Sequence, residues 1–600
     1  MENLGLAGRI AKYFLNSKLT PLLVVASLLL GFFAVFTTSR DEEPQIVVPM
    51  IDIMIPYPGA KSQEVNSLAV KPLEKLMWEI PDVEYVYSYA GDGFGIVTVR
   101  FKVGANPEDS LVKLYSKVMS NYYKMPKGAM DPIIKPKSID DVPILSITLH
   151  SDKYSSYDLR RVAEVVEDEI KQLHNVSETT IIGSKPKEID VLFDPVKLNA
   201  YNIMLPQVVQ ALENANFSLP SGEFDKDNYR YKVRTGQFLK TKEDVENIVV
   251  AVYNNAPIKI KDIAKVEEGE GEIENYVQFG YGQASGNKDK PLENAVTIAV
   301  AKKTGSNAVV VAENIIEKLN EMKGKVIPSD INFTITRNYG ETASEKANEL
   351  IEHLLIATFS IVLLIAVTLG FRESLIVAVT IPVTLAIALF LSEMYGYSLN
   401  RVTLFALIFS IGILVDNSIV VLENIHRWFS MRKVSQEEAA VIATDEVGNP
   451  TILATFAVIV ALLPMAFVTG LMGPYMRPIP INSSVAMFFS MLLAFILTPY
   501  LAIRWLKHDE HHESPESLGK EDEARAGFLV RFFNAVYMPL FQSRVKRWLF
   551  LGFAGMLLVI SAMLIVSRAV LVKMLPYDNK SELQVVLDMP EGTPLQETYR

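Results

Sequence analysis

Cysteine is absent from all 600 residues of the sequence. This absence excludes disulfide bonds and thiol chemistry, and it is compatible with an oxidising compartment without proving one. The net charge is −11 and no strongly basic segment with interleaved aromatic residues occurs, so nucleic acid is not expected as a partner. No glycine-rich loop follows the P-loop pattern, and no Ser/His/Asp order argues for catalysis. The sequence therefore predicts neither an enzyme nor an ATP-driven protein. No cofactor is expected.

Apolar residues dominate part of the chain and not the rest. Half of the residues are hydrophobic, although 21% are charged. A chain of this length also exceeds the usual size of one domain. Together these features predict a divided protein, partly in a membrane and partly in water.

Seven runs are long and apolar enough to span a bilayer of roughly 30 Å, which takes about 20 helical residues. They lie at 20–38, 352–371, 374–392, 402–422, 451–470, 482–503 and 548–568. The first run resembles a signal peptide, but a long basic flank and the lack of a convincing cleavage site favour a retained anchor.

Basic residues indicate how the seven spans are oriented. Arg9, Lys12 and Lys18 precede the first span, and further clusters follow the fourth and precede the seventh. By the positive-inside rule, residues 1–19 and the linker 504–547 are cytoplasmic, whereas 39–351 and 569–600 lie outside. Within that linker, residues from about 526 to 548 mix aromatic and basic side chains. They suit an amphipathic helix on the membrane surface, with a buried packing helix as the alternative.

The external region 39–351 has the patterning of a water-soluble domain. A strand, a helix, a hairpin around Gly91 and Gly93, and a helix capped by Asn106 with Pro107 at its first position follow in order. This β-α-β-β-α-β order predicts a ferredoxin-like unit. A second unit is expected from about residue 142, with its helix at 157–174, a strand at 188–195, and a strand-rich insertion at 220–275.

The end of the sequence resembles the start of its external region. Gly59–Glu64 and Gly592–Glu597 align, each ending in Gln-Glu. Internal duplication is common in transporters, so we expect residues 569–600 to begin a second copy and the chain to stop early in it.

Asp416 stands well inside the fourth apolar run, where a charge is costly and must face protein or water. At 3.6 residues per turn, two polar stripes form on this helix. Gly412, Asp416, Glu423 and Arg427 share one stripe, and Asn417 and Asn424 share the next. Gly412 would let another helix approach closely beside Asp416.

A carboxyl group at this depth is either neutral and desolvated or ionised beside a cation. No lysine or arginine lies within the interior of any of the seven runs, so a cationic partner would come from sequence not present here. Asp416 is therefore a candidate proton-binding switch, the alternative being a structural acid that never titrates. Glu423 and Arg427, near the interface, are expected to form an ordinary helix-end pair.

The stretch "GILVDNSIVVLENIHR" resembles the resistance-nodulation-division (RND) superfamily of proton-driven exporters, especially its hydrophobe/amphiphile efflux branch. Further similar segments are "LGFRESLIVAVTIPVTL", "LLPMAFVTG", "FKVGANPEDSLVKL" and "KKTGSNAV", so the resemblance covers nearly the whole sequence. It implies an α-helical polytopic membrane protein with a large periplasmic α+β region of ferredoxin-like subdomains. Family chains carry twelve spans and two large external loops, so this sequence looks like the N-terminal part.

The resemblance also implies a mechanism and partners. Family members place adjacent aspartates in the fourth span; Asp416 matches the first, but Asn417 occupies the second and cannot titrate. The resemblance implies a homotrimeric permease of the bacterial inner membrane that works with a periplasmic adaptor and an outer-membrane channel. Multidrug efflux of amphiphilic small molecules, powered by the proton gradient, is the implied activity, and the insertion near 220–275 would belong to the docking part.

Two alternative functions remain open. Heavy-metal efflux would need a path of methionine or carboxylate side chains, and a non-transporting scaffold or export-assisting protein would keep partner binding without proton dependence. The histidine-rich stretch 508–513 departs from the zincin pattern and favours a solvated loop over a metal site. No metal site is predicted.

Overall fold

A computed structural model describes residues 4–44, 46–184, 186–253, 255–269, 275–287, 289–431, 434–506, 532–570, 582–590 and 592–600. Two compact units divide the chain. One comprises Met1–Ile503 with Leu587–Arg600, and the other comprises Arg504–Val586.

Seven helical segments in the described residues are long and apolar enough to cross a membrane. They are α2 (Leu19–Thr37), α12 (Tyr339–Thr368), α13 (Phe371–Met394), α14 (Arg401–Met431), α15 with its 3-10 extension (Gln436–Phe467), α16 with α17 (Met472–Trp505) and α19 (Arg544–Val566). Each overlaps one predicted run, but α12 begins at Tyr339 rather than near residue 352. Its earlier start is set by Asn338, whose side chain accepts a hydrogen bond from the Glu341 backbone amide at 3.1 Å.

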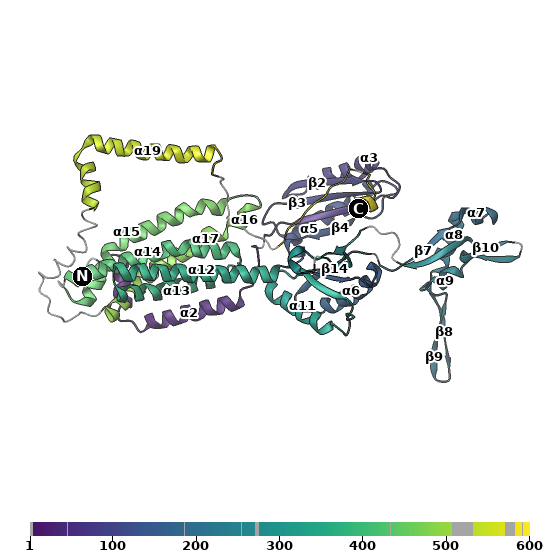
Figure 1. The fold of residues 1–600 in the computed structure, drawn as a ribbon, viewed down its shortest axis with the longest axis horizontal. Helices are drawn as coiled ribbons and strands as arrows, with labels where there is room; N and C mark the ends of the chain where they lie inside the picture. Colours follow the sequence, from purple (N-terminus) through teal and green to yellow (C-terminus); the bar gives the residue numbers. More distant parts are fainter. Residues whose placement is uncertain are drawn as a thin grey trace. The chain divides into compact units, whose positions relative to one another are not determined.

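The apolar helices within Met1–Ile503 are held together by close backbone contacts. Figure 1 shows α12 to α15 and α17 side by side. On α2, Gly31 faces Ala386 of α13, and a Cβ at Gly31 would lie 2.3 Å from the Ala386 Cβ. The short helix α1 (Leu6–Phe14) packs on α15, where the Gly8 amide donates to Asp445 Oδ1 at 3.1 Å. Small residues thus allow these helices to approach each other closely.

The unit formed by residues 50–137 has the predicted ferredoxin-like order. Its elements are β1 (Met50–Pro56), a helix of three segments (α3 Ser62–Val65, η1 Asn66–Val70, α4 Lys71–Met77), β2 (Val83–Gly91), β3 (Phe94–Phe101), α5 (Pro107–Ser120) and β4 (Ile133–Lys137). The antiparallel sheet has the order β2-β3-β1-β4. One face of this sheet is buried against the helices, so Ile51, Ile53 and Ile55 alternate inward along β1.

Two local predictions in this unit are confirmed. Gly93 has φ +81° in the β2–β3 turn, a conformation that disfavours other residues. Asn106 Oδ1 accepts from the amides of Glu108 and Asp109 at 2.9 and 3.1 Å, and Pro107 opens α5.

The second ferredoxin-like unit is assembled from two separated segments. It contains β5 (Leu145–Ser151), α6 (Ser156–Lys171), β6 (Val176–Ile182), β14 (Glu293–Lys302), α11 (Ala308–Met322) and β15 (Asn332–Asn338). β14 pairs with both β5 and β6, and β15 completes the sheet on β5. The predicted strand at 188–195 is therefore wrong as the partner in this sheet, because β6 takes that place.

An inserted third unit separates the halves of the second. Its strand β7 (Glu188–Phe193) pairs with β12 (Ala264–Gly269), and its core gathers Val208, Ile260 and Ile263. Its other elements are α7 (Pro195–Ala200), α8 (Leu205–Ala215), α9 (Lys242–Glu246), β10 (Val249–Tyr253), β11 (Ala256–Lys259) and α10 (Ile260–Ile263). The exposed hairpin of β8 (Leu219–Lys226) and β9 (Tyr229–Thr235) stands off from this core (Figure 1). The predicted insertion at 220–275 is rich in strands as expected, since it holds β8 to β12. It was too short, because the inserted unit begins with β7 and includes α7 and α8.

The remaining expectations are only partly within the described chain. Residues 582–590 are described and carry no strand, and the helix α20 (Leu595–Tyr599) follows. Of the predicted amphipathic segment, the described residues 532–542 are helical. The histidine-rich stretch 508–513 lies outside the described residues.

Candidate functional site

The helix α14 carries the candidate acid at its midpoint, because Asp416 has 15 residues of the helix on either side. Asn400 fixes the start of this helix: its Oδ1 accepts from the amides of Val402 and Thr403, each at 3.0 Å. The first half of the helix, from Val402 to Val415, is almost wholly apolar, so Asp416 is reached only after nearly four helical turns.

One face of α14 is not covered by the described residues. Gly412, Asp416, Glu423 and Arg427 are all exposed there, as the predicted stripe requires. Phe405, Phe409 and Val420 extend the same exposed face. The close helix approach expected at Gly412 is not made within the described chain, since a Cβ built there has no atom of a neighbouring element within 4 Å.

Asn417 points to the buried side of the same helix. Its Oδ1 accepts a hydrogen bond from Thr455 Oγ1 of α15 at 3.2 Å, and the residue is only 8% exposed. Consecutive helical residues are about 100° apart, so Asp416 and Asn417 face different surroundings. The structure separates these two predicted site residues, and Asn417 connects two helices.

Serine hydroxyls connect α14 to α17 on another buried face. Ser410 Oγ donates to Ser483 Oγ at 2.9 Å, and Ser483 Oγ approaches the Ala406 carbonyl at 3.3 Å. Ser490 donates to the Leu414 carbonyl. With α12, α13 and α15 also in contact, α14 is a central helix whose uncovered face bears the acid.

The C-terminal end of α14 is attached to α15 through Glu446. The Arg427 guanidinium donates to both Glu446 oxygens at 2.9 and 2.8 Å, and the Trp428 indole donates to Oε2 at 2.7 Å. Asn424 Nδ2 donates to Oε2 at 3.1 Å and to the Ala443 carbonyl at 2.8 Å. The predicted pair of Glu423 with Arg427 is wrong. In the described chain Arg427 of α14 pairs with Glu446 of the neighbouring helix α15, because Glu446 offers a bidentate acceptor.

Glu446 was missed because the predicted fifth span began at residue 451. The signal lay in the sequence "ATDEVGNP", where two acids precede an apolar run without a break. Both acids make contacts between helices. Asp445 accepts a hydrogen bond from the Gly8 amide of α1, and Glu446 pairs with Arg427 at the end of α14.

A second connection joins this end of α14 to α13. His426 Nδ1 lies 2.9 Å from Glu373 Oε1, and the Glu373 side chain is 9% exposed. In contrast, no ion pair to Asp416 is formed by the described residues, nor do those residues contain a group of three or more His, Asp or Glu placed to hold a metal ion. Asp416 is thus an acidic side chain at mid-helix, on the face that the described residues leave uncovered.

Comparison with known proteins identifies the family of the chain. A model of the AcrB/AcrD/AcrF family matches residues 10–600. The chain belongs to this family. Its members are RND permeases, which are transporters rather than enzymes, so the family predicted from the fourth-helix motif is confirmed.

Individual relatives are more distant in sequence. Multidrug resistance protein MdtC of Pantoea ananatis is 27% identical over 503 residues, which cover 83% of this chain and 48% of the relative. An uncharacterized transporter of Haemophilus influenzae is 26% identical over 482 residues, covering 80% of this chain and 45% of the relative. MdtC of Citrobacter koseri is 27% identical over 479 residues, covering 79% and 45%. The chain therefore spans about half the length of the curated relatives it matches.

Proposed function

We propose that the protein carrying this sequence is the inner-membrane permease of an RND efflux pump. It exports hydrophobic or amphiphilic small molecules in exchange for protons, and Asp416 is the group that takes up and releases the proton. The observation that carries this proposal is the position of Asp416 at the centre of α14, on the face that the described residues leave uncovered.

The cost of burying a charge explains why protonation at Asp416 would move the helix. A charged side chain at the centre of a membrane helix costs about 2.5–3.5 kcal/mol on insertion scales, whereas the neutral acid costs less. Ionised Asp416 needs a cation or water on the uncovered face, and neutral Asp416 does not. Each proton event therefore changes which packing of that face is stable.

The proton gradient supplies the energy for this change. Moving one elementary charge through the membrane potential yields about 2.3 kcal/mol per 100 mV. Asn417 cannot titrate, and its side chain is hydrogen-bonded to Thr455. Of the adjacent residues Asp416 and Asn417, we therefore assign only the Asp416 carboxyl to the transport cycle. Asn417 instead keeps α14 aligned with α15 while Asp416 changes its charge.

The setting of the pump is part of the same proposal. By the positive-inside rule, the basic residues Arg9 and Lys12 support a cytoplasmic N-terminus, which would put the ferredoxin-like units in the periplasm. There they would capture substrate, as a homotrimer with an adaptor and an outer-membrane channel. The inserted third unit, with its exposed β8–β9 hairpin, would supply the docking part.

The test expresses the whole protein in bacterial cells that lack their own pumps and measures accumulation of a fluorescent amphiphile. Asp416→Asn removes the titratable proton and keeps the side-chain shape, so accumulation should rise to the level of cells without a pump. An uncoupler should do the same to the wild type.

Glu423→Gln is the matched control, because Glu423 lies on the same exposed face but about two turns nearer the end of the helix. It should pump at close to the wild-type rate at equal membrane abundance. If Asp416→Asn continues to export dye, Asp416 is a structural acid and the proposed coupling is wrong.

A further inference from the structure

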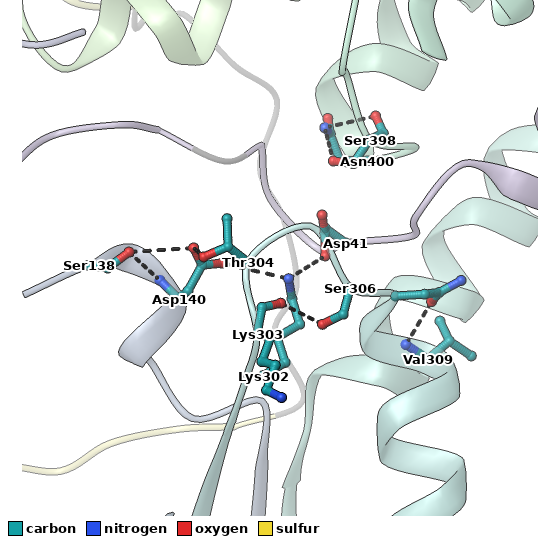
Figure 2. A network of polar contacts seen from close by, with 11 residues as sticks. Asp41, Ser138, Asp140, Lys302, Lys303, Thr304, Ser306, Val309, Ser398 and Asn400 are labelled. Atoms are coloured by element: carbon teal, nitrogen blue, oxygen red, sulfur yellow. Dashed lines mark hydrogen bonds and ion pairs between the residues drawn. The ribbon is translucent and has the colours of Figure 1, made fainter. Parts of the chain in front are cut away.

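Three charged side chains are buried together close to where α2 ends. Lys302 Nζ lies 3.4 Å from Asp41 Oδ1 and 3.7 Å from Asp140 Oδ1, and the three side chains are 7%, 7% and 13% exposed. Figure 2 shows the lysine between the two carboxylates. Asp41 follows α2, Asp140 belongs to the turn η3 (Ile139–Asp141) between the two ferredoxin-like units, and Lys302 ends β14.

The surroundings hold Asp140 in place. Thr304 Oγ1 donates to Asp140 Oδ2 at 2.8 Å, and the Asp140 amide donates to Ser138 Oγ at 3.2 Å. One cation therefore joins three segments that are far apart in the sequence. We call Asp41, Asp140 and Lys302 the Lys302 triad.

Stability alone does not account for the Lys302 triad. Desolvating buried charges costs about as much as their attraction returns, and apolar residues of similar size are often at least as stable. Neither the Asp41 oxygens nor Lys302 Nζ make well-aligned hydrogen bonds, so the attraction is between charges. A buried ion group of this kind is better suited to fixing relative position than to adding stability.

Backbone hydrogen bonds continue the connection from the triad to α14. The Leu399 amide donates to the Ser39 carbonyl at 2.9 Å, and the Asp41 amide donates back to the Leu399 carbonyl at 3.2 Å. The Ala308 amide donates to the Arg40 carbonyl at 3.2 Å. Leu399 directly precedes the Asn400 cap of α14, and Ala308 is the first residue of α11.

We propose that Lys302 is a positioning residue for transport, holding segment 39–41 so that a displacement of α14 is passed to the second ferredoxin-like unit. This inference rests on the proposed function. Asp416 lies 15 residues from the start of α14, roughly 22 Å at 1.5 Å per residue. A helix is stiff along its axis, so a shift at Asp416 reaches Leu399, then residues 39–41, and then both Lys302 and the first turn of α11.

The proposal predicts that cutting the triad separates proton entry from substrate export. The whole protein is reconstituted in liposomes with an imposed pH gradient, and a pH-sensitive dye and a fluorescent amphiphile report the two fluxes. Lys302→Met keeps most of the side-chain length and removes the charge. We expect proton entry to persist, and the amount of amphiphile moved per proton to fall at least ten-fold.

The adjacent lysine provides a matched control. Lys303 is exposed, and its backbone amide rather than its side chain bonds to Asn175. Lys303→Met should therefore keep the wild-type ratio of amphiphile to protons. A wild-type ratio in Lys302→Met would overturn the proposal.

Asp416→Asn, measured in parallel, distinguishes this inference from the proposed function. Loss of both fluxes in Asp416→Asn supports the proposed function whatever Lys302→Met does, and unchanged fluxes in Asp416→Asn contradict it. If Lys302→Met does not reach the membrane, Asp41→Asn combined with Lys302→Met removes one charge of each sign. A double variant that also fails to reach the membrane, or that keeps the wild-type ratio, contradicts the positioning role.

Discussion

At the scale of single residues, neighbouring polar side chains in the apolar helices have different surroundings. Asp416 is exposed on the uncovered face of α14, whereas Asn417 is buried and bonded to Thr455. Glu446 accepts hydrogen bonds from three side chains of α14, one of them Arg427. Glu423 lies one turn from Arg427 but does not pair with Arg427 in the described chain. The helical period predicts which residues share a face, but the identity of the partner depends on which neighbouring helix lies there.

The buried carboxyl of Asp41 predicts how the thermal stability of the protein depends on pH. Burial raises the pKa of its carboxyl above the usual 3.8; the Lys302 charge and the nearby Ser398 hydroxyl oppose this rise, and the Asp140 charge adds to it. A carboxyl whose folded pKa is raised contributes stability at low pH, and this contribution is lost as the pH rises through the folded pKa. The wild type should therefore lose thermal stability relative to Asp41→Asn as the pH rises from about 4 to 8.

Melting temperatures of the purified protein across this range measure the effect. Asp227→Asn is the control, because Asp227 is an exposed turn residue with positive φ, which asparagine also tolerates. Its difference from the wild type should not change with pH. A difference for Asp41→Asn that is equally flat would show that burial does not penalise the Asp41 charge.

At the scale of elements, close packing of α2 on α13 depends on Gly31. A leucine there would place its Cβ 2.3 Å from the Ala386 Cβ, so the two helices would have to separate. Overpacking of this kind costs about 1–3 kcal/mol or more. Gly31→Leu should lower the folded, detergent-stable fraction several-fold, as measured by size-exclusion chromatography of a fluorescent fusion.

Ala26→Leu is the matched change on the exposed side of α2. It adds a leucine side chain of the same size, with one carbon fewer in net gain, without meeting α13, so the folded fraction should stay near that of the wild type. Equal losses for the two variants would mean that the close approach at Gly31 does not limit folding.

The ferredoxin-like elements illustrate where sequence patterns succeed and where they fail. The cap at Asn106 and the turn at Gly93 were predicted correctly, because both depend on neighbouring residues. The second unit was assigned β7 instead of β6. The sequence of β6, "VSETTII", has few apolar residues, whereas β7 has a stronger strand pattern but pairs with β12. Strand pattern predicts a strand, and pairing across distant segments decides which sheet contains it.

At the scale of the whole molecule, the apolar helices and the second ferredoxin-like unit meet at segment 39–41. Arg40 and Leu399 form a parallel bridge there. Because the chain has no cysteine, Arg40→Cys with Leu399→Cys introduces a single possible disulfide. If this contact moves as one body during transport, the oxidised double variant should export the amphiphile at near the wild-type rate.

Oxidised single-cysteine proteins control for effects of the substitutions themselves. The fraction cross-linked is read from the mobility of a fragment after cleavage by a protease at a site engineered between the two cysteines. A cross-linked protein that is inactive and recovers with reductant would show instead that segment 39–41 and Leu399 separate during the cycle.

The sequence alone was sufficient for the seven apolar helices, the first ferredoxin-like order, the family and the central acid, because hydrophobic period, caps and motifs are local properties of the chain. Only the tertiary structure decided that Asn417 is buried against α15, that Arg427 pairs with Glu446, and that Lys302 lies between Asp41 and Asp140. Those contacts join segments tens to hundreds of residues apart. Their geometry depends on how complete helices and sheets pack, which no local pattern encodes.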